Sequence, residues 1–133
     1  MEANGVIVDT HLWIEFFSGK ANVASTEIAR LIKDRRIRLA GPVLYELLVG
    51  PRVEGQRQYL QSQLRAFALL DTTETVWLRA IALGRLHAVF ARQVPPSDVL
   101  IAAHCAVHGC ALFTRDSHFD AFPELKRHRI RSH

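Results

Sequence analysis

The chain has 133 residues, of which 49% are hydrophobic and 23% are charged, as is typical of a single globular domain. This apolar fraction excludes a disordered chain. The longest stretch without a charged residue, residues 99–114, is too short to cross a bilayer as a helix. The net charge of +4 favours an anionic partner such as nucleic acid.

The first residues of the chain lack the basic and apolar regions of a secretory signal. The two cysteines, Cys105 and Cys110, are too few for a disulfide framework. We therefore expect a cytoplasmic protein with free thiols, folded as one domain over residues 1–133.

Short apolar runs alternate with segments of helical periodicity in the first half of the chain. The first apolar run ends at Asp9. Ser25 or Thr26 is suited to cap the second helix, and Pro42 is suited to the first turn of the third. In chain order, we predict a strand at 6–8 and helices at 12–17 and 24–36, then a strand at 37–40 and a helix at 41–48.

The second half of the chain continues the alternation. Residues 67–70 fit either an extended segment or a continuation of the helix before them. Ser97 is suited to cap the last long helix, and Gly109 is suited to follow its end. We predict helices at 56–65, from just after Thr72 and Thr73 to about 92, and at 98–108, then a strand at 111–114. The residues expected to be buried in the helix that ends near 92 are Trp77, Ile81, Leu86, Val89 and Phe90.

Strands separated by helices indicate an α/β layer structure with a mainly parallel sheet, and such sheets bind ligands beyond the carboxyl ends of their strands. Asp9 and Asp116 each follow an apolar run, and Glu46 lies early in the helix after the second strand. The helix that begins at Asp98 runs roughly 15 Å away from this end of the sheet, and the next strand returns by roughly 17 Å. We therefore expect the four carboxylates to meet at one end of the sheet.

A cluster of four carboxylates in an apolar setting requires a cation or shared protons. Two carboxylates about 4 Å apart repel by roughly 4 kcal/mol at an effective dielectric constant of about 20. Ligands that offer only oxygen select Mg²⁺ or Mn²⁺ rather than Zn²⁺. Taken singly, each acid also has an ordinary structural explanation, as a turn residue after a strand or as an acid in the first turn of a helix.

Two other site chemistries fit less well. His104 and His108 lie one helical turn apart and near both cysteines, but no Glu stands between them, so we expect buried thiols and partly exposed histidines rather than a zinc site. A haloacid-type phosphatase needs a second aspartate two positions after the first, where this chain has His11. We expect Trp13 and its aromatic neighbours to belong to the core.

Four motifs together identify a family resemblance. They are Val8-Asp9-Thr10-His11-Leu12-Trp13-Ile14, Val43-Leu44-Tyr45-Glu46-Leu47-Leu48-Val49-Gly50, Ser97-Asp98-Val99-Leu100-Ile101-Ala102-Ala103 and Leu112-Phe113-Thr114-Arg115-Asp116-Ser117-His118-Phe119. In order and spacing they resemble the PIN-domain ribonucleases, and among them the VapC-type toxins of bacterial toxin–antitoxin pairs, over essentially the whole chain.

The resemblance implies a PIN-like three-layer α/β/α fold and a metal-dependent endoribonuclease that acts on RNA. Its implied cofactor is Mg²⁺, with Mn²⁺ as the alternative, and its implied partner is a small antitoxin. The implied catalytic and metal-binding residues are Asp9, Glu46, Asp98 and Asp116, with Thr10 and Thr114 as neighbouring hydroxyls. The alternative is a catalytically inactive PIN fold that binds RNA or a protein.

One position departs from the family pattern. The family often has a second aspartate two residues after the one that matches Asp116, and this chain has His118 there, with Asp120 further on. Asp120 is therefore a candidate for a supporting role. Arg115 is another, because it is placed to offset the acidic cluster or to contact phosphate.

Two surface features complete the expectations. The helices at 12–17, 43–49 and 59–70 carry more large apolar residues than one short sheet covers, which predicts a homodimer. The densest basic cluster lies near the C-terminus and fits either a solvated tail or a contact to phosphate. Its members are Lys126, Arg127, His128, Arg129, Arg131 and His133.

Overall fold

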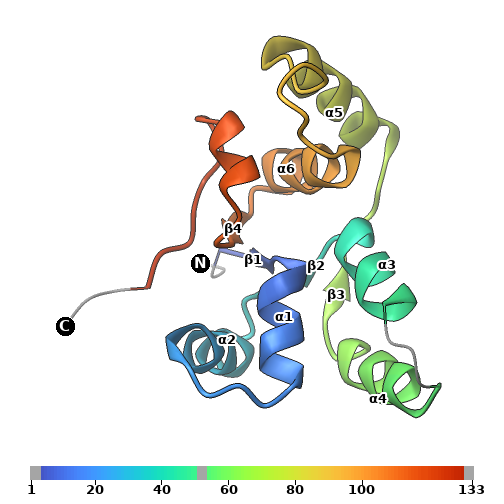
Figure 1. Ribbon diagram of the computed structural model, residues 1–133, viewed down its shortest axis with the longest axis vertical. Coiled ribbons are helices and arrows are strands. Elements are labelled where there is room, and N and C mark those ends of the chain that lie inside the picture. Colours follow the sequence, from blue (N-terminus) through green and yellow to red (C-terminus); the bar gives the residue numbers. More distant parts are fainter. Residues whose placement is uncertain (1–3, 51–53, 131–133) are drawn as a thin grey trace.

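The computed structural model describes residues 4–50 and 54–130. Its elements are β1 (Val6–Val8), α1 (Thr10–Phe17), α2 (Val23–Lys33), β2 (Ile37–Leu39), α3 (Gly41–Val49), α4 (Glu54–Leu64), β3 (Ala68–Leu69), α5 (Glu74–Leu86), α6 (Pro96–His108), β4 (Ala111–Phe113) and the 3-10 helix η1 (Ser117–Ala121). Helices α5 and α6 lie on one side of the sheet, and α1 and α2 lie on the other (Figure 1). The predicted three-layer α/β/α arrangement is therefore confirmed.

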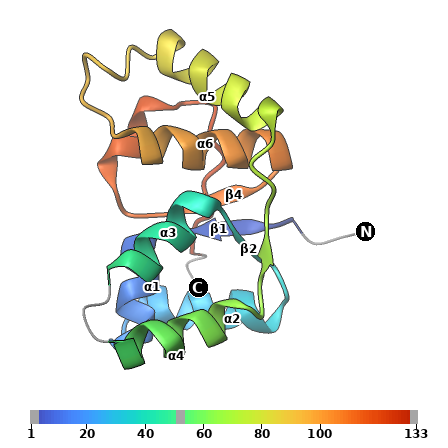
Figure 2. The same ribbon diagram turned by 90° about the vertical axis from the view of Figure 1, so that its right-hand side faces the viewer.

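The sheet has four strands in the order β3-β2-β1-β4, and every neighbouring pair is parallel. β1 lies inside the sheet, and its three residues are fully buried. Figure 2 shows the sheet between the α5–α6 pair and the helices of the other layer. Because the strands are parallel, the carboxyl ends of β1 and β4 meet at the same edge.

Most of the predicted elements are confirmed with small changes at their ends. Residues 68–69, which the sequence left open, form β3 and pair with β2. The N-cap of α2 is Asn22 rather than Ser25 or Thr26, because Asn22 Oδ1 accepts a hydrogen bond from Ser25 N at 2.8 Å. Helix α6 begins at Pro96 without a side-chain cap, so the prediction that Ser97 caps it is wrong.

The predicted long helix ending near residue 92 is wrong in its length and in its buried face. Helix α5 ends at Leu86, and Ala88 and Gln93, with φ of 49° and 58°, interrupt any continuation. Its buried residues are Val76, Ala80 and Leu83. The apolar residues that we expected to be buried are largely exposed, because a different stripe of α5 packs against the layer below. The exposed residues are Trp77 at 51%, Ile81 at 55%, Leu86 at 72% and Phe90 at 96% exposure. Val89, the fifth predicted residue, is half-buried and packs against the core.

The aromatic residues of α1 belong to the core, as predicted. Trp13 is fully buried and stacks on Phe17 with ring centroids 5.4 Å apart. Cys105 and Cys110 are buried free thiols, but His104 is also fully buried, which corrects the expectation of a partly exposed ring. The His104 ring is held by Thr72 Oγ1 at 2.9 Å and by the Leu100 carbonyl at 2.7 Å.

Among the described residues, no helix combines the length and the apolar character that a membrane crossing requires.

Candidate metal centre

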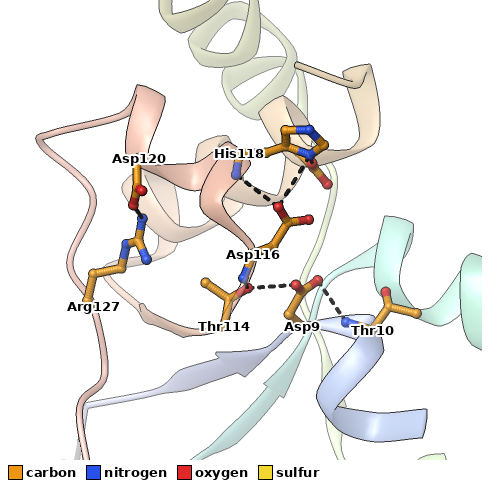
Figure 3. A network of polar contacts seen from close by, with 8 residues as sticks. Asp9, Thr10, Thr114, Asp116, His118, Asp120 and Arg127 are labelled. Atoms are coloured by element: carbon orange, nitrogen blue, oxygen red, sulfur yellow. Dashed lines mark hydrogen bonds and ion pairs between the residues drawn. The ribbon is translucent and has the colours of Figure 1, made fainter. Parts of the chain in front are cut away.

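Asp9 joins the end of β1 to the start of α1, and its side chain is fixed from two directions. Asp9 Oδ1 accepts a hydrogen bond from Thr10 N at 2.8 Å, as expected of a helix N-cap. Asp9 Oδ2 accepts a second hydrogen bond from Thr114 Oγ1 at 2.7 Å. Figure 3 shows Asp9 between these two threonines. The residue is buried, with 5% exposure, so its carboxylate has little room to change its orientation.

Asp116 lies just beyond β4, beside Asp9 (Figure 3). Its backbone N–H donates to Thr114 Oγ1 at 3.0 Å, so the Thr114 hydroxyl accepts from Asp116 while it donates to Asp9. The Asp116 side chain caps η1 by accepting a hydrogen bond from His118 N at 2.8 Å. Thr114 therefore ties the two acids that end β1 and β4 to each other.

Asp98 approaches the same place from the first turn of α6. His118 Nδ1 lies 3.2 Å from Asp98 Oδ2 and 3.3 Å from Asp116 Oδ1, so the imidazole bridges two carboxylates. One ligand atom from each of Asp98, Asp116 and His118 lies within 4.8 Å of the other two. Burial raises the pKa of Asp98 to about 6, and the negative charges of Asp116 and Asp9 add to this rise, while His118 opposes it.

Glu46 reaches this group from α3 through Thr10. Thr10 Oγ1 donates to Glu46 Oε1 at 2.9 Å, while the backbone N–H of the same threonine donates to Asp9. Glu46 is thus linked to Asp9 through Thr10 and lies outside the close group of Asp98, Asp116 and His118.

The two charged residues expected to support the acids point elsewhere. Asp120 is exposed and pairs with Arg127 at 3.0 Å, on the side of η1 away from Asp9 (Figure 3). Arg115 pairs with Glu15 of α1 rather than with the aspartates, because that carboxylate faces it across the surface. Arg115 therefore does not offset the charge of the cluster, although it lines the same cavity as Asp9 and Asp116.

This cavity, of about 370 Å³, includes two residues that the sequence did not single out as parts of a site. They are His11 and Glu15, which lie four residues apart on α1 and so share a face of that helix. Their position on the helix that directly follows Asp9 is the sequence feature that indicates them as parts of the site. Together with Arg115 they form the outer wall of the cavity.

The donor set fits a hard divalent cation. Among residues 4–50 and 54–130, no Lys or Arg pairs with Asp9, Asp98 or Asp116, and His118 is the positively chargeable group next to them. Buried carboxylates without such a partner repel one another, and oxygen ligands of this kind bind Mg²⁺ or Mn²⁺. The imidazole of His118 adds one nitrogen ligand to the oxygen set.

Asp98 predicts a pH dependence of stability in the absence of divalent cations. Its pKa in the folded protein, about 6, is above the ordinary value of 3.8, so the folded state binds this proton more tightly than the unfolded state does. The resulting stabilisation is complete below about pH 4 and is lost as the pH rises through about 6.

Asp98→Asn removes this dependence. In urea denaturation with EDTA, we expect the unfolding free energy of the variant, relative to that of the unaltered protein, to rise by about 2 kcal/mol between about pH 4.5 and about pH 7.5. Asp71→Asn, on an exposed residue outside the cluster, is the control and should show no such rise. An equally flat difference for Asp98→Asn would contradict the electrostatic interpretation.

Comparisons with known proteins identify the family of this fold. Residues 6–125 match the family model described as PIN domain. The curated relatives VapC ribonuclease Mb1587 of Mycobacterium bovis and Ribonuclease VapC11 of Mycobacterium tuberculosis are each 26% identical to this chain over 126 residues, which cover 90% of this chain and 92% of theirs.

Solved structures share the fold at lower identity. DNA-bound VapBC from Salmonella typhimurium superposes with a TM-score of 0.80 at 18% identity and covers 95% of this chain and 98% of that chain. FitAcB from Neisseria gonorrhoeae superposes with a TM-score of 0.75 at 19% identity and covers 93% and 96%. Because the family model matches residues 6–125, which are most of the chain, the chain belongs to the PIN domain family.

Proposed function

We propose that this chain is a metal-dependent endoribonuclease that hydrolyses RNA phosphodiester bonds as the toxin of a toxin–antitoxin pair. The observation that carries the proposal is the convergence of Asp9, Asp98 and Asp116 without a Lys or Arg partner among the described residues. The relatives named VapC ribonuclease support the activity and its substrate class. In this proposal residues 1–133 form one nuclease domain that acts in the cytoplasm.

The proposed metal ligands are the three aspartates, with Glu46 as a fourth acid held through Thr10. Mg²⁺ is the proposed ion and Mn²⁺ is the alternative, because both prefer oxygen ligands. When bound, such an ion lowers the pKa of water and stabilises negative charge that develops on a phosphate. Thr114 and Thr10 have positioning roles, since each orients Asp9 by a hydrogen bond.

The outer wall of the cavity contains one residue suited to contact the RNA backbone. Arg115 is exposed and paired with Glu15 beside Asp9 and Asp116. A guanidinium here is suited to hold a phosphate of the RNA next to the acids, because it offers several donors in one plane. Asp120 has no role in the proposal, since its carboxylate pairs with Arg127 instead.

The proposal predicts that activity and stability change in opposite directions in Asp98→Asn. The amide cannot supply the lost ligand charge, so we expect RNA cleavage in Mg²⁺ to fall by about 100-fold or more. Without divalent ions the variant should be at least as stable as the unaltered protein, because several repulsions between carboxylates are removed. Cleavage of a fluorophore-quencher RNA and thermal melts with EDTA or Mg²⁺ measure the two quantities.

The control for this experiment is again Asp71→Asn, which should retain both cleavage and the rise in melting temperature on addition of Mg²⁺. If Asp98 only supported the start of α6, Asn would replace it at little cost to either quantity. Cleavage by Asp98→Asn at the rate of the unaltered protein would therefore contradict the proposed metal site. RNA binding by the unaltered protein without any Mg²⁺-dependent cleavage would favour the inactive PIN-fold binding module.

His118 occupies the position where the family often has an aspartate, which makes it a test of metal use. His118→Asp adds a carboxylate between Asp98 and Asp116, so the Mg²⁺ concentration needed for half-maximal cleavage should fall by roughly ten-fold. The same change should lower the melting temperature in EDTA, because it adds repulsion and removes the bridging imidazole. His118→Asn is the control, and an equal gain with Asn would show that added charge is not the cause.

The proposal also includes a homodimer and a small antitoxin, for which the surface offers two apolar areas. Ile14 of α1 and Tyr59 of α4 are exposed and line one cleft, and Tyr45 of α3 and Trp77 of α5 are exposed and line another. Ile81 is also exposed on α5. Exposed apolar areas of this kind are typical of protein interfaces. The solved relatives named VapBC support an antitoxin partner.

Sedimentation at micromolar concentration should give the mass of a dimer. Because a buried glutamate without a partner is costly, Ile81→Glu or Tyr59→Glu should shift that mass to the monomer, according to which area forms the interface. A monomer of the unaltered chain at this concentration would contradict the homodimer.

A further inference from the structure

A second charged cleft, of about 510 Å³, lies at the end of the sheet opposite to the aspartates. Asn4 and Ala111 on its wall stand at the amino ends of β1 and β4, whereas Asp9 and Asp116 follow their carboxyl ends. Within residues 4–50 and 54–130, no acidic residue lines it. The basic residues on its wall are Arg30, Arg36, Lys126, Arg127, His128 and Arg129.

The backbone fixes the basic segment of this cleft in place. Leu112 N donates to the Lys126 carbonyl at 2.9 Å, and His128 N donates to the Leu112 carbonyl at 2.9 Å. Arg127 forms a parallel bridge with Leu112, so the segment runs along the free edge of β4. Residues 126–128 are therefore part of the sheet rather than a solvated tail, while Arg131 and His133 lie outside the described residues.

The acids near the cleft are already engaged. Glu27 is buried beneath it and accepts hydrogen bonds from Arg30 Nε at 2.9 Å and from His128 Nε2 at 2.5 Å. The hydrogen bond from Arg30 is the main reason that the pKa of Glu27 is lowered, and His128 lowers it further. Asp34 pairs with Arg30 at 3.6 Å. Glu27 thus serves as a scaffold that holds two basic side chains at the floor and rim of the cleft.

Three positively charged side chains of the cleft are not neutralised by an acid among the described residues. Arg36 donates through Nε to the Asn4 carbonyl at 2.9 Å, which does not neutralise it. Lys126 and Arg129 are exposed, and neither pairs with an acid in the described parts of the chain. The cleft therefore presents several positive charges, all on one side of the molecule, that only an external anion satisfies.

From this arrangement we infer that the cleft binds phosphate groups of an RNA strand that also reaches the aspartates. The inference rests on the proposed function, because it extends the same substrate along the surface. Residues 111–116 extend roughly 17 Å from the cleft to Asp116, and several nucleotides of a single strand span this distance. Residue types also favour a nucleic acid over an acidic protein. In the described part of the chain, the wall offers no large apolar side chain to anchor a protein, whereas a phosphate backbone is bound by charge alone.

With this cleft, the two ends of the sheet have different functions. The aspartates select the bond to be cut and require a divalent cation, while Lys126 and Arg129 hold the strand without any cation. Binding through the cleft should therefore persist in EDTA and weaken with salt, because phosphate contacts release counterions. An RNA that is too short to extend from the aspartates to the cleft should gain no affinity from the cleft.

The test compares two double variants of the full chain with the same net charge. Lys126→Gln/Arg129→Gln removes two charges from the cleft, and Arg65→Gln/Arg92→Gln removes two exposed charges elsewhere. Binding of a fluorescein-labelled single-stranded RNA of about 12 nucleotides is measured in EDTA by anisotropy over a range of KCl concentrations. Thermal melts verify that both variants fold.

We expect the cleft variant to lose roughly ten-fold or more in affinity at low salt, and the control variant to lose less than about two-fold. The slope of log K against log[KCl] should become shallower by about 1.4 in the cleft variant, since each phosphate contact in a single strand contributes about 0.7. Equal losses in both variants would show an effect of net charge alone and would overturn the inference. An unchanged affinity in the cleft variant would overturn it as well.

Cleavage in Mg²⁺ gives a second readout. With the RNA of about 12 nucleotides, KM of the cleft variant should rise by the same factor by which its affinity falls, and kcat should not change. Cleavage of an RNA of about four nucleotides should not change. A fall in kcat on both RNAs would contradict a binding role. A polyglutamate peptide of similar length is the competitor, and cleft-dependent binding of this peptide without cleft-dependent binding of RNA would assign the surface to an acidic protein instead.

The two proposals fail in different ways. If the unaltered protein binds RNA through the cleft but does not cleave it in Mg²⁺ or Mn²⁺, the endoribonuclease is contradicted and the cleft is supported. If it cleaves both RNAs and the cleft variant binds and cleaves like the control, the endoribonuclease stands and the cleft is contradicted.

Discussion

The parallel pairing of β1 with β4 is the constraint on which the rest of the site depends. Val8 lies opposite Phe113 in this register, so the residues that follow each strand, Asp9 and Thr114, come into hydrogen-bonding distance. A shift by one residue would turn every side chain of β1 to the other face of the sheet. The buried, fully apolar β1 resists such a shift, because all three of its residues pack in the core.

The repulsion that this register creates is balanced by short polar contacts rather than by fixed positive charge. Thr114 connects Asp9 to Asp116, and Thr10 connects Asp9 to Glu46. Hydroxyl groups orient the carboxylates and leave their negative charge in place. Burial and mutual repulsion then raise the pKa of Asp98, which is the expected behaviour of a carboxylate prepared for a cation that the protein itself does not supply.

Charge is distributed unevenly between the two ends of the sheet. The carboxyl end gathers the aspartates, and the amino end gathers the basic wall around Lys126 and Arg129. A polyanion is repelled at one end unless a cation is present and is attracted at the other end in all conditions. The net charge of +4 therefore understates the contrast in charge between the two ends of the sheet.

The sequence by itself determined the parallel sheet, the edge at which the acids gather and the order of the strands and helices, apart from β3 and the end of α5. These features follow from local patterns, because an apolar run that ends in Asp marks the carboxyl end of a strand whatever surrounds it. The level at which Asp98 and Asp116 meet also follows from the lengths of one helix and one strand. The family motifs then identified the same acids independently.

Only the tertiary structure decided which partners the remaining side chains take. Helix α5 has apolar residues on more than one face, so its sequence does not say whether Val76 or Trp77 is buried, and packing against α6 makes the choice. Arg115 stands next to Asp116 in the chain but pairs with Glu15, a contact across 100 positions that no local pattern encodes. Contacts of this kind depend on how helices rotate against the sheet, which is settled by the packing of the whole core.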